Sequence, residues 1–231
     1  MSSGLRLYRV DKVNANKWRV GLLAILCLAI SLNWFNAWST KHEAVSVVAV
    51  ELDKAQVELE AANKELEELK AKEAARVKKL KGVADFIQQV NPKVGQAKAL
   101  KQAEYEIFFA DYFNVDLPTS LAISYRETHF TCDIVSWDLS SYGCKQINLE
   151  AWKSYYSNLN LSKQKLFDPK FNIALGNHML AMHIDEYNGN LSRAIERYRG
   201  SVRPSTNEEY RQDVFAKAKY IRKYLNHVLT A

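Results

Sequence analysis

An apolar repeat with a strict period of seven between Val45 and Val90 constrains this 231-residue chain more than any other feature. The first row comprises Val45, Leu52, Leu59, Leu66, Glu73, Leu80 and Ile87, and the second comprises Val48, Ala55, Ala62, Leu69, Arg76, Val83 and Val90. Two such rows, with Glu and Lys at many other positions, are typical of the a and d seam of a coiled coil. Proline and glycine within Asn91–Gly95 predict the end of the helix. We therefore predict a coiled-coil stalk at residues 43–91.

The stalk residues also fit a single charged helix that never pairs. Glu73 and Arg76 interrupt the apolar rows, and alanines weaken the second row. Under both interpretations the segment is a helical spacer. Only the coiled coil would make the protein a homo-oligomer through its stalk.

A charge-free segment precedes the stalk, because charged residues stop at Arg19 and resume at Lys41. A run of this length can cross a bilayer as a helix, which needs roughly 20 mainly apolar residues. Trp18 stands at one end and three further aromatic residues stand near the other, where such rings favour the membrane interface. We predict a transmembrane helix at residues 20–38 after a basic tail at residues 1–19, and we count a lipid bilayer among the partners.

The five basic residues before the span predict a single-pass protein with a cytoplasmic N-terminus. Everything after Thr40 would then face the periplasm or the cell exterior. The alternative is a cleaved secretory signal, because the strongly apolar part, Val20–Leu32, has the length of a signal h-region. No convincing Ala-x-Ala cleavage site follows it, which favours a retained anchor.

The net charge of +6 would be compatible with a nucleic-acid partner if the positive charge were spread over the folded domain. The charged residues in each segment of the chain show whether this is so. Residues 1–40 hold 5 basic and 1 acidic side chains, residues 41–95 hold 10 of each, and residues 96–231 hold 17 and 15. The excess therefore lies mostly in the N-terminal tail. This distribution argues against a nucleic-acid partner.

The remaining segment, residues 96–231, predicts a mainly α domain whose helices break at "FNVDLP", "FDPK", "YNGN" and "GSVRPST". Asp116 or a neighbour caps a helix begun by Pro118, which places Glu127 in the last turn. The helix dipole and nearby apolar groups disfavour the charged form of that carboxylate. A protonated glutamate is what a general acid needs. Pairing with Arg126 at the surface is the alternative.

Three blocks of residues carry a resemblance to a known family. They are Glu127, Thr128 and Phe130; Gly143, Gln146 and Ile147; and Asn172, Ile173, Gly176, Leu180, Ala194 and Tyr198. In this order they resemble the lysozyme superfamily, and most closely the soluble-lytic-transglycosylase-type (SLT) domain, over about residues 100–205. The chain departs from the family at Thr128, which replaces a serine, and at Arg199 and Ser201, which flank Gly200 in place of asparagine and alanine.

The resemblance implies a mainly α, lysozyme-like fold and a peptidoglycan lytic transglycosylase that needs no cofactor. Glu127 would act as acid and then as base on the β-1,4 bond between N-acetylmuramic acid and N-acetylglucosamine. The C6 hydroxyl would then attack C1 and leave a 1,6-anhydro end. The family pattern places substrate-binding residues at Ser141, Tyr142, Gly143, Gln146 and Tyr198.

Ser141 stands where the closely similar turn of animal-type lysozymes carries an aspartate. A serine cannot supply the second carboxylate of a hydrolytic pair, which favours transglycosylation. A hydrolytic muramidase remains the alternative if Asp138 or Asp133 bends into the site. Trp137 and the aromatic residues of Trp152–Tyr156 offer surfaces on which sugars can stack, although packing in the core would occupy several of them.

Cysteine and histidine residues give weaker signals. Cys132 and Cys144 bracket the loop after Glu127, and they fit either a disulfide or two free thiols. His178 and His183 do not share one helical face, and no further ligands complete a set, so we expect no metal site.

Taken together, these features predict a membrane-anchored SLT domain that opens the cell wall locally. Such an architecture suits a phage virion protein, including one in an internal virion membrane, or a bacterial secretion or conjugation apparatus. An alternative from another class is a structural anchor whose lysozyme-like domain binds glycan without turnover.

Overall fold

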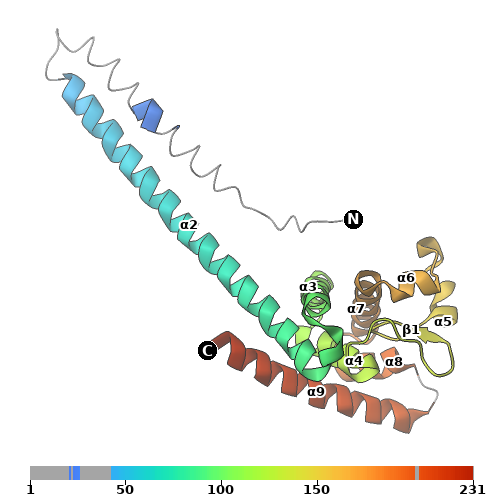
Figure 1. The fold of residues 1–231 in the computed structure, drawn as a ribbon. Helices are drawn as coiled ribbons and strands as arrows, with labels where there is room; N and C mark the ends of the chain where they lie inside the picture. Colours follow the sequence, from blue (N-terminus) through green and yellow to red (C-terminus); the bar gives the residue numbers. More distant parts are fainter. Residues whose placement is uncertain (1–20, 22, 27–42, 201–202, 231) are drawn as a thin grey trace, which may run out of the picture. The chain divides into compact units, whose positions relative to one another are not determined.

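The computed structural model describes residues 21, 23–26, 43–200 and 203–230. The chain divides into two compact units, residues 1–70 and 71–231. The helices, in chain order (Figure 1), are α2 (Glu43–Val90), η1 (Pro92–Val94), α3 (Gln96–Tyr112), α4 (Leu117–Thr128), α5 (Leu149–Lys153), η2 (Ser157–Leu159), α6 (Lys163–Phe167), α7 (Pro169–Glu186), α8 (Leu191–Arg199) and α9 (Pro204–Thr230). Strands β1 (Ser141–Tyr142) and β2 (Ile147–Asn148) form one hairpin. The predicted mainly α class is confirmed.

The predicted membrane segment falls mostly on residues about which the structure gives no description. Within the described ranges, no helix is long and apolar enough to cross a membrane. The basic tail at 1–19 and all of the predicted span at 20–38 except residues 21 and 23–26 lie outside those ranges.

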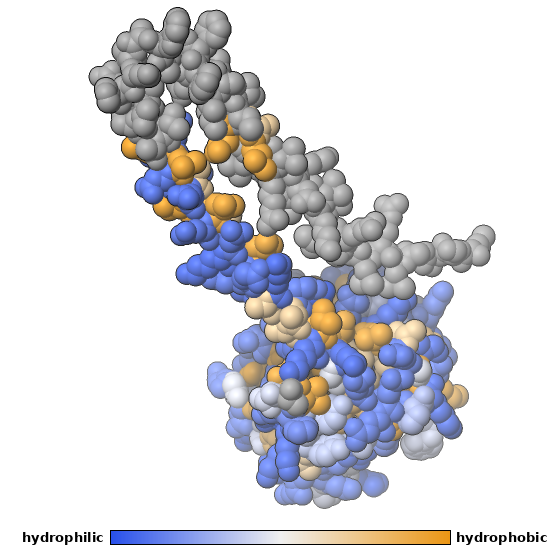
Figure 2. Space-filling view, turned by 60° about the vertical axis from the view of Figure 1, so that its left-hand side comes forward, coloured by the Kyte–Doolittle hydropathy of each residue, from blue (hydrophilic) through white to orange (hydrophobic). Residues whose placement is uncertain are grey.

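Helix α2 ends at Val90, one residue before the predicted end of the stalk, and Asn91 caps the 3-10 helix that follows. Along this helix, the apolar positions Leu52, Leu59 and Leu69 are about half exposed. Figure 2 shows hydrophobic and hydrophilic surface interspersed along the helix. The structure therefore shows the helix but not the coiled coil, and pairing with a second copy stays a prediction.

The last turns of α2 belong to the C-terminal unit. Val83 and Ile87, which we assigned to the coiled-coil seam, are fully buried in the core of this domain, together with Phe86. Gly82 lies so close to α9 that an added Cβ would be 3.1 Å from Val228. A seven-residue period does not say which partner fills the seam, and here the last heptads pack within the same chain. The domain core therefore begins before the predicted boundary at residue 96.

Helix α4 lies at the centre of this core, where it packs against α3 and α9. Its residues Leu121, Ala122 and Ile123 are fully buried. A second apolar cluster forms around the hairpin and comprises Tyr142, Ile147, Leu149, Tyr156, Leu161, Leu166, Leu175 and Met179. Tyr198 of α8 packs against both clusters. The end of α4 and the hairpin are thus held by one continuous apolar interior.

Candidate active site

Helix α4 places Glu127 in its last turn, as predicted. Asp116 is the N-cap, and its Oδ2 accepts a hydrogen bond from the backbone N–H of Thr119 at 3.0 Å. Pro118 stands in the first turn, where its missing N–H costs nothing. His129, with a φ of 50°, ends the helix in the left-handed region. The helix and the position of the carboxylate are both confirmed.

The carboxyl group of Glu127 is half-buried and accepts a hydrogen bond at Oε1 from the Tyr210 hydroxyl at 2.6 Å. Burial raises the pKa of Glu127 above its ordinary value, because water no longer stabilises the charged form. The hydrogen bond from Tyr210 and the positive charges of Arg199, Arg126 and Lys145 oppose this rise. The net shift is upward, as a general acid requires.

The alternative interpretation, in which Glu127 pairs with Arg126 at the surface, does not match the contacts in the structure. Arg126, the cation that would pair with it, instead places Nε 2.6 Å from Asp213 Oδ2. Lys217 also pairs with Asp213. Arg126 therefore forms its ion pair with Asp213 of α9, and its positive charge affects Glu127 from a distance.

Tyr210 of α9 is a site residue that the sequence did not reveal. Its side chain is buried, and the guanidinium groups of Arg126 and Arg199 lie 5.7 and 5.9 Å from its ring centroid. Burial and the nearby charge of Glu127 raise the pKa of Tyr210 well above its usual value, so the hydroxyl remains a donor. Arg199, a departure from the family pattern, thus helps to hold the tyrosine that contacts Glu127. The period of buried residues along α9 predicts only that Tyr210 is buried.

Hydrogen bonds join the β1–β2 hairpin to the loop before it and close its turn. The backbone N–H of Ser141 donates to Ser136 Oγ at 2.9 Å, and the Tyr142 hydroxyl donates to the Leu139 carbonyl at 2.6 Å. The amide Nε2 of Gln146 donates to the carbonyl of Gly143 at 3.0 Å. These contacts build the turn, and sugar binding by Ser141, Tyr142 or Gln146 stays a prediction.

Packing against neighbouring elements requires a glycine at position 143. Its φ is +79°, and an added Cβ would be 2.3 Å from both Asn172 Nδ2 and the carbonyl oxygen of Leu166. The amide of Asn172 donates to the carbonyls of Tyr142 and Leu166 at 2.9 Å each. The close approach of α6 and α7 therefore explains why this position is a glycine, and substrate binding by Gly143 stays a prediction.

Tyr198 reaches the same turn from α8. Its hydroxyl donates to the carbonyl of Lys145 at 3.0 Å, and burial raises the pKa of this phenol well above its usual value. We predicted that Tyr198 orients the sugar. The structure shows that the hydroxyl donates to the turn, and sugar binding by Tyr198 stays a prediction.

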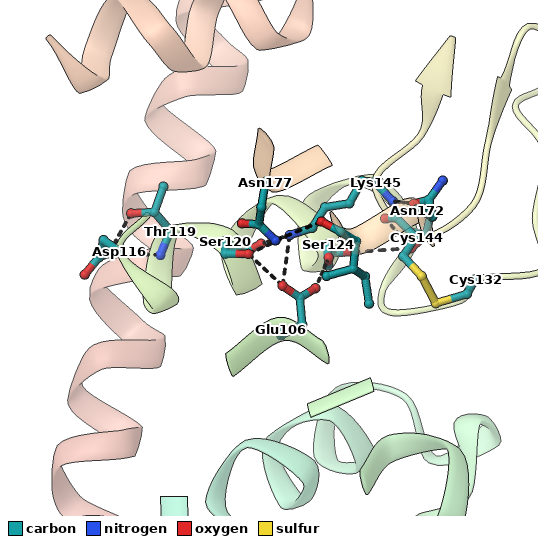
Figure 3. Close-up of polar contacts among 12 residues, drawn as sticks. Glu106, Asp116, Thr119, Ser120, Ser124, Cys132, Cys144, Lys145, Asn172 and Asn177 are labelled. Atoms are coloured by element: carbon teal, nitrogen blue, oxygen red, sulfur yellow. Dashed lines mark hydrogen bonds and ion pairs between the residues drawn. A yellow bond between two sulfur atoms is a disulfide. The ribbon is translucent and has the colours of Figure 1, made fainter. Parts of the chain in front are cut away.

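Lys145 forms a buried network that the sequence also did not reveal (Figure 3). Its side chain is 1% exposed and passes over Gly176, where an added Cβ would be 2.7 Å from Lys145 Cγ. Nζ lies 3.0 Å from Glu106 Oε2 of α3 and donates to the carbonyl and hydroxyl oxygens of Ser120 at 2.6 and 2.8 Å. The hydroxyls of Ser120 and Ser124 donate to the two oxygens of Glu106 at 2.6 and 2.5 Å. This network connects the turn to α3 and α4.

The end of α4 is fastened to the turn at two further points. Thr128 Oγ1 donates to the carbonyl of Cys144 at 3.1 Å, so the threonine supplies the hydroxyl that serine supplies in the family. Cys132 and Cys144 form a disulfide, which decides between the two interpretations of these cysteines. The position of Glu127 relative to the turn is therefore fixed by a hydrogen bond, a disulfide and the Lys145 network.

A comparison with family models matches residues 104–221, half of the chain, to the transglycosylase SLT domain. The chain belongs to the transglycosylase SLT domain family. This family has the lysozyme-like fold and acts on peptidoglycan as a lytic transglycosylase. A search of the curated proteins found no match. The SLT match includes every predicted site residue, whereas the last turns of α2, which complete the core, lie before it.

In this SLT domain the two candidate second acids lie in the exposed loop before β1. Asp138 accepts hydrogen bonds from the hydroxyls of Ser136 and Ser140 at 2.5 and 2.9 Å, and these bonds lower its pKa. Asp133 is exposed. Within the described ranges, neither aspartate forms a hydrogen bond with Glu127. Nor does any group of three or more His, Cys, Asp or Glu side chains there suit a metal ion.

The predicted stacking aromatics separate into two groups in the SLT domain. Trp137 is 95% exposed at the tip of the loop before β1. Trp152 and Tyr156 pack together, and the Tyr156 hydroxyl lies 2.9 Å from His178 Nδ1. Tyr155 is exposed beside them. Trp137 and Tyr155 can therefore offer ring surface to a sugar, and the other two contribute mainly to packing.

Proposed function

We propose that this protein is a peptidoglycan lytic transglycosylase in which Glu127 serves as acid and then as base. The observation that carries the proposal is the environment of Glu127: a half-buried carboxyl group with a raised pKa, held by Tyr210. A raised pKa favours the protonated form of the carboxyl group, which is the form that can protonate a leaving oxygen. Membership of the SLT family supports the same reaction.

In the proposed reaction, Glu127 donates its proton to the glycosidic oxygen between N-acetylmuramic acid and N-acetylglucosamine, and the C1–O bond breaks. The N-acetyl group of the substrate stabilises the developing positive charge at C1. The C6 hydroxyl oxygen then bonds to C1 while the Glu127 carboxylate takes its proton. This step closes the 1,6-anhydro ring, regenerates the acid and consumes no water.

The contacts around Glu127 support one acid rather than two. Asp138, the candidate partner for hydrolysis, is exposed and accepts hydrogen bonds within its own loop. Ser141 stands at the position where an aspartate would serve a hydrolase, and it has no carboxylate. Tyr210 fits a positioning role, because its hydroxyl donates a hydrogen bond to one oxygen of Glu127.

We also propose that residues 20–38 anchor the protein in a membrane and that the stalk and SLT domain face the periplasm or exterior. The sequence carries this proposal through its charge-free run and flanking aromatic residues. The activity would then open the wall locally, as a phage virion or a secretion apparatus requires. Extraction with alkaline carbonate tests the anchor, because an integral protein stays with the membrane and a peripheral one is released.

The test of the proposed reaction compares full-length wild type with Glu127→Gln on purified peptidoglycan. We expect wild type to release soluble fragments and Glu127→Gln to lose the release by at least about a thousandfold. Asp138→Asn and Asp133→Asn are matched controls that remove one carboxylate each and retain activity. Loss of release in Asp138→Asn or Asp133→Asn would favour the hydrolytic scheme. Glycan binding without release by wild type would indicate a structural anchor.

A further inference from the structure

A pocket of about 690 Å³ lies along the first turns of α3, and Glu127 is not among the residues that line it. Its walls come from the segment before α3, from α3 itself, from the segment after α4 and from the start of α7. The lining residues are Asn91, Lys93, Val94, Lys98, Lys101, Gln102, Tyr105, Phe130, Thr131, Cys132, Asp133, Phe167, Asp168 and Pro169. The volume falls in the range of sites that hold small ligands or short peptides.

The wall of this pocket contains a buried polar group without a partner. Gln102 is 3% exposed, and its Nε2 forms no hydrogen bond with any described residue. A buried amide N–H without an acceptor is unfavourable and uncommon in folded proteins. Rotation of the Gln102 side chain toward the pocket would let a ligand oxygen supply the missing acceptor, because Nε2 itself is buried in the structure.

Positive charge surrounds the same wall. Lys93, Lys98 and Lys101 line the pocket, and none of them forms an ion pair within the described part of the chain. The N-cap of α3, Gly95, has no side chain that could satisfy the free N–H groups, so the positive end of the helix dipole adds to the field. The wall formed by α3 therefore favours a carboxylate.

Negative charge and apolar surface come from the other segments that line the pocket. Asp133 and Asp168 line the pocket from the segments after α4 and before α7, and Val94, Phe167 and Pro169 supply apolar surface. One carboxylate oxygen of Asp168 already accepts hydrogen bonds from two backbone N–H groups at the start of α7. Asp133 forms no ion pair with any described residue, so its charge is available to a ligand. A ligand with carboxylates, small apolar groups and an amine would match all three kinds of wall. A short acidic peptide has this combination.

The chain also limits how far the pocket lies from the candidate acid. Phe130 is only three residues after Glu127, so their Cα atoms are at most about 11 Å apart. An extended peptide of four or five residues spans about 13 to 18 Å. The length of such a peptide is therefore at least as large as the separation of the Glu127 and Phe130 Cα atoms.

We propose that this pocket binds the short acidic peptide that branches from the glycan strand of peptidoglycan. The inference rests on the proposed function, because the substrate determines which peptide is present. Binding of the peptide would add affinity for strands that still carry it without altering the bond-breaking step. Peptide-bearing strands would then be better substrates than bare strands through a lower KM.

The first test measures binding of a synthetic tetrapeptide of alanine, glutamate, diaminopimelate and alanine to the full-length protein. The double variant Lys98→Ala/Lys101→Ala removes two exposed ammonium groups, and we expect it to weaken binding about tenfold. Lys219→Ala/Lys223→Ala is the matched control, because it removes the same charge from exposed positions of α9. Equal affinity of wild type and Lys98→Ala/Lys101→Ala, or no binding by wild type, would overturn the inference.

The second test compares intact peptidoglycan with glycan strands from which an amidase has removed the peptides. For wild type we expect a KM about tenfold lower on strands with peptides and a similar kcat on both. In Lys98→Ala/Lys101→Ala the difference in KM should disappear while kcat is retained. If Glu127-dependent cleavage occurs without any preference for peptides, the pocket assignment fails and the proposed function stands. If the peptide binds as expected but no cleavage depends on Glu127, the proposed function fails instead.

Discussion

The buried pair of Lys145 and Glu106 gives a quantitative test of how the turn is held to the domain. Lys145→Met removes the ammonium group and leaves the fully buried Glu106 with only the hydroxyls of Ser120 and Ser124. Burial lowers the pKa of Lys145 even though Glu106 opposes the shift, so desolvation outweighs the attraction between the charges. The pair is therefore not a large net source of stability, but losing one member isolates a charge.

The unpaired buried charge determines how much stability each single variant should lose. Removing one member of a buried pair typically costs about 3 to 5 kcal/mol, compared with about 5 to 15 kcal/mol for the stability of a whole domain. Lys145→Met and Glu106→Gln should each lower the unfolding temperature by roughly 10 °C, at about 2 to 4 °C per kcal/mol for a domain of this size. An exposed control, Lys223→Met, should change the free energy of unfolding by less than about 0.5 kcal/mol.

The double variant Lys145→Met/Glu106→Gln tests the reasoning more sharply than either single change. It removes both charges of the pair, and the new carboxamide can accept from the hydroxyl of Ser124 and donate to the hydroxyl of Ser120. We expect it to cost only about 1 to 2 kcal/mol, so the two changes should be coupled by more than about 2 kcal/mol. Urea unfolding of the four proteins, followed by circular dichroism, measures that coupling. Additive costs, or single changes below about 1 kcal/mol, would refute the buried-pair account.

Three other changes test the site. Tyr210→Phe removes the hydrogen bond that lowers the pKa of Glu127, so the alkaline limb of the pH profile of kcat should move to higher pH. The value of kcat itself should fall about ten- to a hundredfold. An unchanged pH profile would contradict this role of Tyr210. Gly143→Ala places a Cβ against neighbouring atoms at positive φ and should cost at least about 2 kcal/mol in urea unfolding, and a neutral effect would mean that the turn relaxes freely. Replacing Cys132 and Cys144 with alanine opens a loop of 12 residues and should cost about 2 to 3 kcal/mol, which calorimetry of the oxidised and reduced wild type checks independently.

Local signals in the sequence predicted the position of Glu127. Asp116 and Pro118 determine where α4 begins, and both act within one turn of the helix. The family motifs then indicated that the turn carrying Gly143 and Gln146 belongs to the same site. Such features are predictable because the physical cause lies next to the residue that it affects.

The partners of that carboxyl group depend on contacts between distant segments. Tyr210 is 83 residues from Glu127, and Lys145 is 39 residues from Glu106. A lysine in a polar turn is usually exposed, so nothing local indicates that Lys145 is buried. The seven-residue period of α2 likewise predicts an apolar seam but does not distinguish a second copy from α9.

The identity of the attacking oxygen is the central claim, and digestion in ¹⁸O-labelled water tests it most directly. The account predicts that full-length wild type releases fragments that carry no ¹⁸O and weigh one water less than hydrolysis products, and that Glu127→Gln releases none. Fragments with one ¹⁸O at the new reducing end would show that water attacks C1. That result would contradict transglycosylation and identify the protein as a hydrolase.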